Sequence, residues 1–315
     1  MHSKRFSLAM TCLAALILVF VTVTATGCSA RKSEQYRRQA DTLYGLGKYE
    51  EAARAYQRSA ETNPQNTLAK VGLARCYLRQ GDQDKAVAKL LEATQDQPPV
   101  EVAFLEAVPL LLRLGRTDEA SQLAAKLTES DEERGKILEA HVLRETNRLD
   151  EAIALLEGLQ AKFPDSEEVR ISLSADYLLA GTPEKAESVL KDLVDRLDTV
   201  STATHMALVK VYQVQGKIGE VVDLFEGLVA KNPDDVKLKL GLAQSLLSAD
   251  RVDAAEKIAR ELYEKDPESG WVNSLLGSCL MEKGEYTDAI PYLQKAAAQL
   301  PNEKDIARKL AVVRG

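Results

Sequence analysis

Residues with reactive side chains are scarce in this sequence. Its 315 residues include 4 cysteines and 3 histidines, and only His141 and His205 among the histidines lie beyond residue 27. We find no glycine-rich loop that would cradle a phosphate, no His-Glu-x-x-His metal pair and no nucleophile elbow. The sequence therefore predicts a protein that is not an enzyme, with no catalytic residue, no metal site, no cofactor and no small-molecule substrate.

Features typical of linkers and of nucleic-acid binding are also sparse. The chain has 17 glycines and 10 prolines, too few for long linkers, and no low-complexity segment. Beyond residue 27 there are 39 basic residues (41 less Lys4 and Arg5) against 48 acidic ones, a net charge of −9. An acidic chain repels the phosphate backbone, so we expect no nucleic-acid partner.

What the sequence does contain is one unit repeated along most of its length. The clearest copy runs from Thr67 to Pro98. Its apolar residues lie at helical spacing on both sides of Gly81: Leu73, Ala74 and Tyr77 before it, and Ala86, Leu90 and Ala93 after it. This pattern predicts a helix, a turn and a second helix that ends before the proline.

Turn residues equivalent to Gly81 recur at a spacing close to 34. They are Gly47, Gly81, Gly115, Asn147, Gly181, Gly216, Asp250 and Gly284, separated by 34, 34, 32, 34, 35, 34 and 34 residues. Asparagine and aspartate are among the few residues besides glycine that tolerate a positive φ, so we expect the same backbone at all these turns. Five residues after each turn stands an alanine, or Val221 in one copy, which predicts a close crossing of the two helices.

The period and the residue pattern resemble the tetratricopeptide repeat. The matching residues are Tyr36, Ala40, Ala52, Tyr56 and Pro64 in the first copy, and Leu276, Gly277, Tyr286, Ala289 and Pro301 in the last. The resemblance implies an all-α fold, a right-handed α-solenoid of about eight helix-turn-helix repeats. We expect the array over residues 33–303, with repeats starting near residues 33, 67, 101, 133, 167, 202, 236 and 270. The apolar face formed by Ile306, Leu310 and Val313 predicts a capping helix over residues 304–315.

Prolines mark two local features within the array. Thr182 and Pro183 predict a helix start, with the threonine hydroxyl as its cap. Pro109 lies inside an apolar helical pattern, where the lost backbone hydrogen bond predicts a kink.

Cys76 and Cys279 are the cysteines of the array. They occupy the same place in the second and eighth units, so the array should hold them much farther apart than the ~7 Å limit for a disulfide. We expect both to be buried free thiols.

The first 27 residues differ from the rest. Lys4 and Arg5 precede a nearly continuous apolar run over residues 8–23, and small residues lead to Cys28. This arrangement is typical of an export signal. The stretch Ala-Thr-Gly-Cys over residues 25–28 resembles a bacterial lipobox. The resemblance implies that Cys28 becomes a lipid-modified N-terminus, with residues 28–32 as a short tether to the membrane.

Two alternatives remain open for this segment. Residues 8–27 are long enough to span a bilayer, so an uncleaved helix would hold the protein in the inner membrane. Ordinary cleavage would instead release a soluble protein. With the lipobox interpretation, and with Ser29 after the cysteine, we expect an outer-membrane lipoprotein of the cell envelope that faces the periplasm.

The family that the repeats resemble binds protein or peptide ligands in a concave groove lined by the first helix of each unit. The residues of each first helix that would line this groove form a stripe along the helix. In this sequence the stripe is rich in apolar residues and, in the second to fourth units, in arginine, with Glu145 as the single acid. Part of the apolar surface must pack between helices, and a helix C-terminus also favours a cation. The remainder predicts a groove for a ligand with apolar anchors and acidic flanks. Its predicted contacts are Val71, Arg75, Leu78, Arg79, Leu105, Leu112, Arg113, Arg144 and Leu178.

Trp271, the only tryptophan, opens the first helix of the eighth unit. Packing between repeats and contact with a partner are both open for it.

Together with the export signal, the resemblance implies a non-enzymatic scaffold for protein–protein interaction at the periplasmic face of the outer membrane. Repeat lipoproteins of this kind help to assemble pili, secretion channels, barrel proteins or exopolysaccharide export machinery. The alternative is an adaptor that presents substrates to a periplasmic protease or cell-wall hydrolase. Identification of the partners would separate the two.

Overall fold

The computed structural model describes residues 29–197 and 199–314, and the regular secondary structure within these ranges is α-helical. The predicted signal segment and Cys28 lie outside the described residues. The chain divides into two compact units, Met1–Lys162 (unit 1) and Phe163–Gly315 (unit 2), and each is considered by itself. In the described part of the chain, no helix is both long and apolar enough to cross a membrane.

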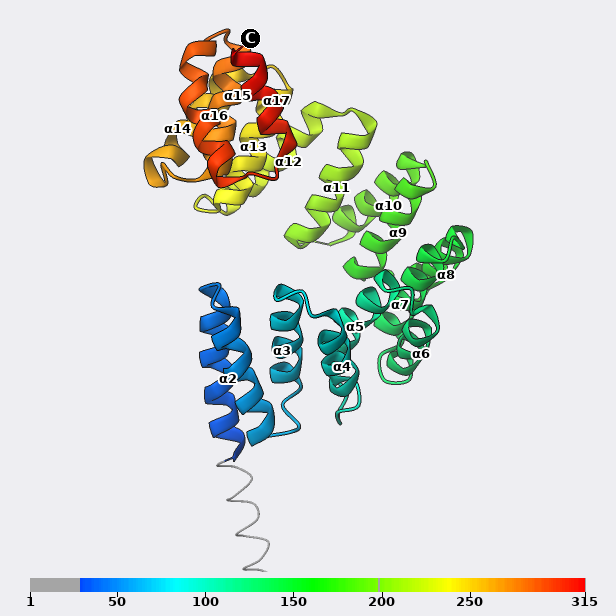
Figure 1. Cartoon of the computed structure of the whole chain (residues 1–315). Coiled ribbons are helices and arrows are strands. Elements are labelled where there is room, and N and C mark those ends of the chain that lie inside the picture. Colours follow the sequence, from blue (N-terminus) through cyan, green and yellow to red (C-terminus); the bar gives the residue numbers. More distant parts are fainter. Residues whose placement is uncertain (1–28, 198, 315) are drawn as a thin grey trace, which may run out of the picture. The chain divides into compact units, whose positions relative to one another are not determined.

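Unit 1 is built from pairs of helices, one pair for each repeat (Figure 1). The first pair consists of residues 29–45 and α2 (Tyr49–Thr62). The later pairs are α3 (Thr67–Arg79) with α4 (Gln83–Ala93), α5 (Glu101–Arg113) with α6 (Thr117–Thr128), and α7 (Glu132–Glu145) with α8 (Leu149–Lys162). Short turns join the two helices of a pair, which therefore lie antiparallel.

Unit 2 continues the same alternation. Its pairs are α9 (Glu167–Leu179) with α10 (Pro183–Arg196), α11 (Thr202–Gln215) with α12 (Ile218–Lys231), α13 (Val236–Ser248) with α14 (Val252–Lys265), and α15 (Gly270–Glu282) with α16 (Tyr286–Gln299). The last helix, α17 (Lys304–Arg314), packs against both α15 and α16. Ile306 and Val313 are buried in that contact, and α17 begins 34 residues after α15, where the first helix of a further repeat would begin.

The turn within every pair contains a residue in the left-handed region. The glycines have φ of 74° (Gly47), 81° (Gly81), 72° (Gly115), 71° (Gly181), 71° (Gly216) and 78° (Gly284), while Asn147 has 60° and Asp250 has 59°. Glycine adopts this backbone without steric cost, and asparagine and aspartate adopt it more readily than other residues. The predicted turn positions are confirmed, and with them the all-α solenoid of helix-turn-helix repeats.

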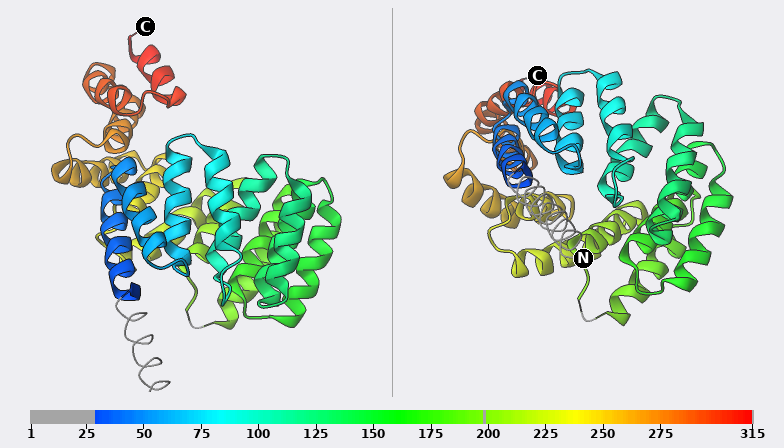
Figure 2. Two further views of the ribbon diagram at one scale, coloured as in Figure 1. Left: turned by 60° about the horizontal axis from the view of Figure 1, so that its bottom comes forward. Right: turned by 90° about the horizontal axis from the view of Figure 1, so that it is seen from below.

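The first helix of a repeat packs mainly against the second helix of the preceding repeat, and in several repeats also against the preceding first helix. In unit 1, α3 contacts α5 and α5 contacts α7; in unit 2, α9 contacts α11 and α13 contacts α15. Among the described residues, the second helices of neighbouring repeats, such as α4 and α6, do not contact one another. Contact on one side makes a stack curve, so the first helices line the inner side of each unit and the second helices its outer side (Figure 2).

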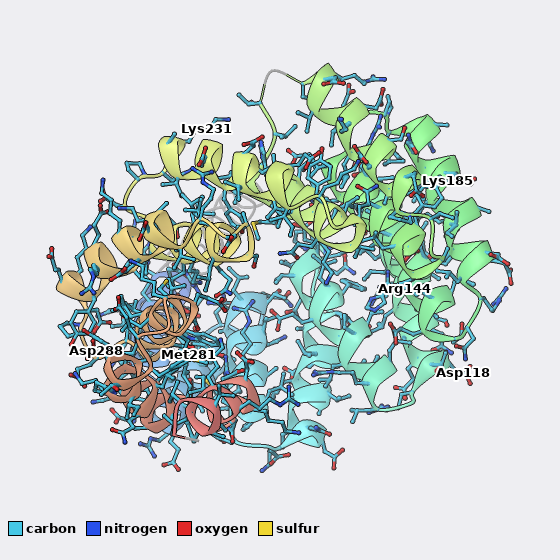
Figure 3. The ribbon with its side chains drawn as sticks, turned by 90° about the horizontal axis from the view of Figure 1, so that it is seen from above. Asp118, Arg144, Lys185, Lys231, Met281 and Asp288 are labelled. Carbon is cyan, nitrogen blue, oxygen red and sulfur yellow. The ribbon has the colours of Figure 1, made fainter. Side chains whose placement is uncertain are left out.

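Side chains follow this division. In Figure 3, Asp118 of α6 lies on the outer side of unit 1, and Asp288 of α16 lies on the outer side of unit 2. Arg144 of α7 and Met281 of α15 lie nearer the inner side of their units. Residues available to a ligand on the inner side therefore come from the first helices.

Small residues let the helices approach closely. The alanines that follow the turns, Ala52, Ala86, Ala120, Ala152, Ala186, Ala255 and Ala289, are fully buried, as a close crossing of the two helices requires. Glycines have the same role between repeats. A Cβ atom at Gly72 would lie 2.4 Å from Cε1 of Tyr56, and one at Gly241 would lie 2.4 Å from Cε1 of Phe225. An aromatic ring on a second helix thus packs directly onto the backbone of the next first helix.

One local prediction is wrong. α10 begins at Pro183 as expected, but Thr182 does not cap it with its side chain. Its hydroxyl instead donates to the carbonyl oxygen of Tyr177 over 3.1 Å, in the last turn of α9, where carbonyl groups lack helical partners.

α5 continues through Pro109 to Arg113. Cys76 and Cys279 are buried free thiols, as predicted.

Candidate protein-binding surfaces

The inner surface of unit 1 contains most of the residues predicted to contact a partner, but Val71 is not among its accessible ones. The Val71 side chain is 1% exposed and belongs to a core cluster that also contains Phe104 of α5. Packing between α3 and α5 therefore occupies it, and its predicted contact with a partner is wrong. Leu78 and Leu112 are half-buried against the same cluster, whereas Leu105 is 38% exposed.

Arg75 is exposed but already paired. Its Nε donates to Oε1 of Glu106 over 2.7 Å, and its Nη2 contacts the same oxygen. Glu106 lies on α5, so the pair joins two neighbouring repeats. The carboxylate neutralises most of the charge that Arg75 would offer to a ligand.

Arg79 and Arg113 are different. They are the last residues of α3 and α5, two first helices in contact, and both side chains are exposed. Arg79 donates to the hydroxyl of Tyr44 over 3.2 Å, and its guanidinium lies 5.8 Å from the ring centroid of Tyr49. Within residues 29–197 and 199–314, neither arginine forms an ion pair with a carboxylate. The free positive charge on this surface therefore lies at the helix ends.

The remaining predicted residues contribute less. Arg144 is partly buried, with its Nε 3.8 Å from Oε1 of Glu145. Arg134 pairs with Glu101 across repeats, its Nη1 lying 2.7 Å from Oε2. The prediction of Glu145 as the single acid on this surface is therefore incomplete. Glu101 and Glu106 also reach the arginines, from helix positions beside the stripe. Leu178, in unit 2, is half-buried.

Two buried cations near repeat junctions were not predicted. Nζ of Lys70 lies 2.6 Å from Oδ1 of Asp96, and the Thr67 hydroxyl donates to Oδ2 of the same carboxylate over 2.8 Å. Arg170 is 1% exposed and donates to the carbonyl oxygens of Pro164 and Val189. Because these groups bond within the protein, they hold the loops between repeats and are not offered to a ligand.

Unit 2 contains an apolar pocket on its inner side. A cavity of about 560 Å³ is lined by Leu240 of α13, Trp271 and Leu275 of α15, and Ile306 of α17, with Lys237, Gln244, Ser274, Glu303, Asp305 and Lys309 around them. Its helical lining comes from first helices and from α17. Trp271 is 54% exposed, which favours the partner alternative for this residue.

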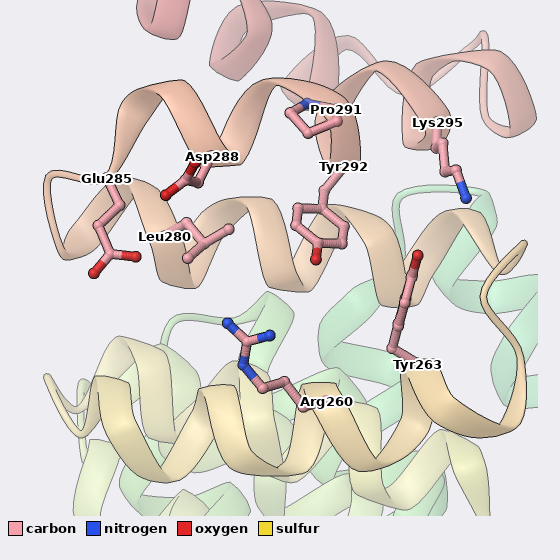
Figure 4. Close-up of a pocket in the computed structure, with 8 residues that line it drawn as sticks. All are labelled: Arg260, Tyr263, Leu280, Glu285, Asp288, Pro291, Tyr292 and Lys295. Carbon is pink, nitrogen blue, oxygen red and sulfur yellow. The ribbon is translucent and has the colours of Figure 1, made fainter.

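The outer side of unit 2 holds a second cavity, of about 400 Å³ (Figure 4). Tyr263 and Tyr292 meet there edge to face, with ring centroids 5.5 Å apart. Its two cations are committed to carboxylates: Arg260 Nε lies 2.7 Å from Glu256, and Lys295 Nζ lies 3.1 Å from Glu268. The cavity is lined by residues of α14, α16 and, through Leu280, α15, and we assign these residues to packing between repeats.

Chemistry at the two thiols is disfavoured. Burial raises the pKa of Cys76 and of Cys279 to about 11, which keeps both protonated and weakly nucleophilic near neutral pH. Among the residues whose placement is described, His, Cys, Asp and Glu form no cluster that would hold a metal ion.

Known proteins share this pattern. One family model described as tetratricopeptide repeat matches residues 37–101 and 105–167, and a second with the same description matches residues 215–279 and 257–313. A crystal structure of a tetratricopeptide repeat protein from Parabacteroides merdae has a TM-score of 0.53 and 15% identity, with coverage of 90% of this chain and 100% of that one. At this identity the likeness concerns the fold alone.

Curated relatives share part of their length with the chain. It is 27% identical to lipopolysaccharide assembly protein B of Escherichia coli over 252 residues, 77% of this chain and 57% of that protein. It is 25% identical to cellulose synthase operon protein C of Pseudomonas fluorescens over 295 residues, 87% of this chain and 22% of that protein. The chain therefore spans little more than half the length of the first of these. The repeat geometry and the family matches together establish that this chain belongs to the tetratricopeptide repeat family, whose folds bind protein or peptide partners.

Proposed function

We propose that the inner surface of unit 1 binds an acidic segment of a partner protein, and that the chain is a non-enzymatic assembly scaffold. The observation that carries this proposal is the exposed pair Arg79 and Arg113, which lacks carboxylate partners among the described residues. A helix C-terminus stabilises a cation by about 0.3 to 1 kcal/mol, but it supplies no counter-charge. A ligand carboxylate would supply that charge at both helix ends.

Apolar side chains on the same helices provide a second element of recognition. Leu68 of α3 is 47% exposed and Leu105 of α5 is 38% exposed. Apolar anchors that leave water supply most of the affinity in such interfaces, while charges set orientation and association rate. The proposed ligand is therefore an extended or helical segment with large apolar residues next to acidic ones.

We propose that the scaffold acts at the cell envelope, anchored to the outer membrane by lipid on Cys28. The names of the two curated relatives concern lipopolysaccharide assembly and cellulose synthesis. Cellulose is a polysaccharide and lipopolysaccharide is a lipid-linked glycan, so machinery for envelope glycans, which includes exopolysaccharide export, agrees with these names best among the machines that the sequence suggested. The lipobox-like residues 25–28 support the anchor.

Site-specific photocrosslinking in native membranes tests the binding surface. A photoreactive amino acid replaces Leu105 on the inner side or, as the matched control, Asp118 on the outer side of the same repeat. We expect the variant at position 105 to capture envelope proteins that the variant at position 118 does not. Capture from position 118 alone would contradict binding on the inner side.

A further inference from the structure

The pocket around Trp271 combines an exposed indole with a buried apolar floor. Trp271 is 54% exposed, whereas Leu275 and Ile306 below it are 4% and 2% exposed. A large apolar group left in water loses the stabilisation that burial would supply, and apolar patches with a polar rim are typical of interaction sites. Tryptophan is also enriched among the residues that dominate binding energy.

The rim of the pocket carries opposite charges on opposite walls. Lys237 stands on α13, while Glu303 and Asp305 stand at the start of α17. Asp305 is neutralised by Lys309, whose Nζ lies 2.6 Å from its Oδ2. Lys237 and Glu303 form no ion pair with any residue in the described ranges. One free positive charge and one free negative charge therefore flank the apolar centre.

Size and wall composition favour a peptide over a flat surface contact. A cavity of about 560 Å³ falls within the range of 300 to 1,000 Å³ that is usual for ligand pockets. An occupant without charge would leave Lys237 and Glu303 unpaired at a partly desolvated rim, and an occupant with charge of one sign would be repelled by one wall. A segment with an acid on one side of its apolar anchor and a base on the other satisfies both walls.

We infer that this pocket is a second binding site, separate from the unit 1 surface, for a partner segment that inserts one large apolar side chain against Trp271. An acidic residue of that segment pairs with Lys237, and a basic residue on the other side of the anchor pairs with Glu303. The terminal helix α17 thus forms one wall of a binding site. This site uses neither Arg79 nor Arg113.

The single tryptophan of the chain provides a direct test. A phage-displayed library of random dodecapeptides is selected on the full protein, and the enriched peptides are synthesised. We expect them to contain an aromatic or large aliphatic residue flanked by one acid and one base, and to shift the emission of Trp271 to shorter wavelength on binding. Substitution of the apolar residue by alanine in the peptide should weaken binding at least tenfold.

Variants of the protein assign the walls. Calorimetry on Trp271→Ala should show at least tenfold weaker binding, and Lys237→Glu should change the preferred peptide to one with two basic flanks. Lys257→Glu, an exposed residue on α14 outside the pocket, makes the same charge change and should bind like the wild type. Circular dichroism establishes that each variant is folded.

Three results would overturn the assignment. These are a selection that enriches no peptide, peptides that bind Trp271→Ala as tightly as the wild type, and equal effects of Lys237→Glu and Lys257→Glu. None of them bears on the unit 1 surface, which can be tested with Arg79 and Arg113 variants independently.

Discussion

Nε of Arg75 on α3 donates a hydrogen bond to Oε1 of Glu106 on α5 over 2.7 Å. This pair spans two repeats and places a carboxylate beside one of the arginines selected from the sequence as a ligand contact. An exposed pair of this kind contributes about 1 kcal/mol or less to stability. Its larger effect is on recognition. Because Glu106 occupies Arg75, the cations of this surface without a carboxylate partner among the described residues are Arg79 and Arg113.

The buried pair formed by Lys70 and Asp96 should be important for stability. Both side chains are less than a tenth exposed, at 5% and 7%. Asp96→Ala removes the close partner of the buried ammonium and leaves it only the half-exposed Glu92, whose Oε1 lies 3.5 Å from Nζ. We therefore expect a loss of up to about 3 to 5 kcal/mol in the free energy of unfolding, measured by urea denaturation. The double variant Lys70→Met and Asp96→Leu should lose less, since no buried charge remains. Equal losses for the single and double variants would contradict this reasoning.

Glycines at the repeat contacts should not tolerate a side chain. Gly241→Ala places a Cβ 2.4 Å from Cε1 of Phe225, and we expect a loss of about 1 to 3 kcal/mol from overpacking. Gly227 in α12 is different, because a Cβ added there would meet nothing within 4 Å. Gly227→Ala should therefore stabilise the protein by up to about 1 kcal/mol through helix propensity. Thermal melts of the two variants should shift in opposite directions; a shared direction would show that the ring moves aside.

Stability should depend on the ionisation of Glu256. Hydrogen bonds from Lys283 and then from Arg260 lower the pKa of this carboxyl below its ordinary value of 4.5. Because the folded-state pKa is the lower one, the ionised group stabilises the native state above about pH 5, and this contribution is lost as the pH falls through the folded-state pKa. The difference in unfolding free energy between wild type and Glu256→Gln should shrink on acidification. A difference that stays constant between neutral pH and about pH 3 would exclude this role.

Anchoring can be measured on the mature protein. If Cys28 is lipidated, mass spectrometry of the N-terminal peptide should show a chain that begins at this residue and carries acyl groups. Cys28→Ala should abolish the modification and remove the protein from the outer-membrane fraction. An unmodified or uncleaved N-terminus in the wild type would support one of the two alternatives.

Local backbone demands could be predicted well from the sequence. The period placed Asn147 and Asp250 at turns, and both have the positive φ that such turns need. Ala152 and its equivalents were expected at close crossings because a small residue recurs there, and they are fully buried. Such features depend on one helix pair at a time, so the residues of a single repeat contain the information.

Contacts between repeats were harder to predict. Whether Val71 faces a ligand or α5, and whether Glu106 reaches Arg75, depends on the angle between successive first helices. The repeat pattern leaves this angle undetermined, because the same apolar residues can pack at several angles between the two helices. The pocket around Trp271 is hard to predict for a related reason. The apolar face of α17 predicts a cap, but α17 begins 34 residues after α15 and therefore also takes the place of a further first helix on the inner surface.

The central claim, that the inner surface of unit 1 binds an acidic protein segment, is tested most directly by the affinity of a crosslinked partner. We expect Arg79→Glu with Arg113→Glu to raise its Kd tenfold or more, about 1.4 kcal/mol, and added salt to weaken binding to the wild type. The control, Arg75→Gln with Glu106→Gln, removes a pair of opposite charges from the same helices and should change Kd by less than about threefold. A folded Arg79→Glu, Arg113→Glu variant that binds the partner with wild-type Kd would contradict the claim.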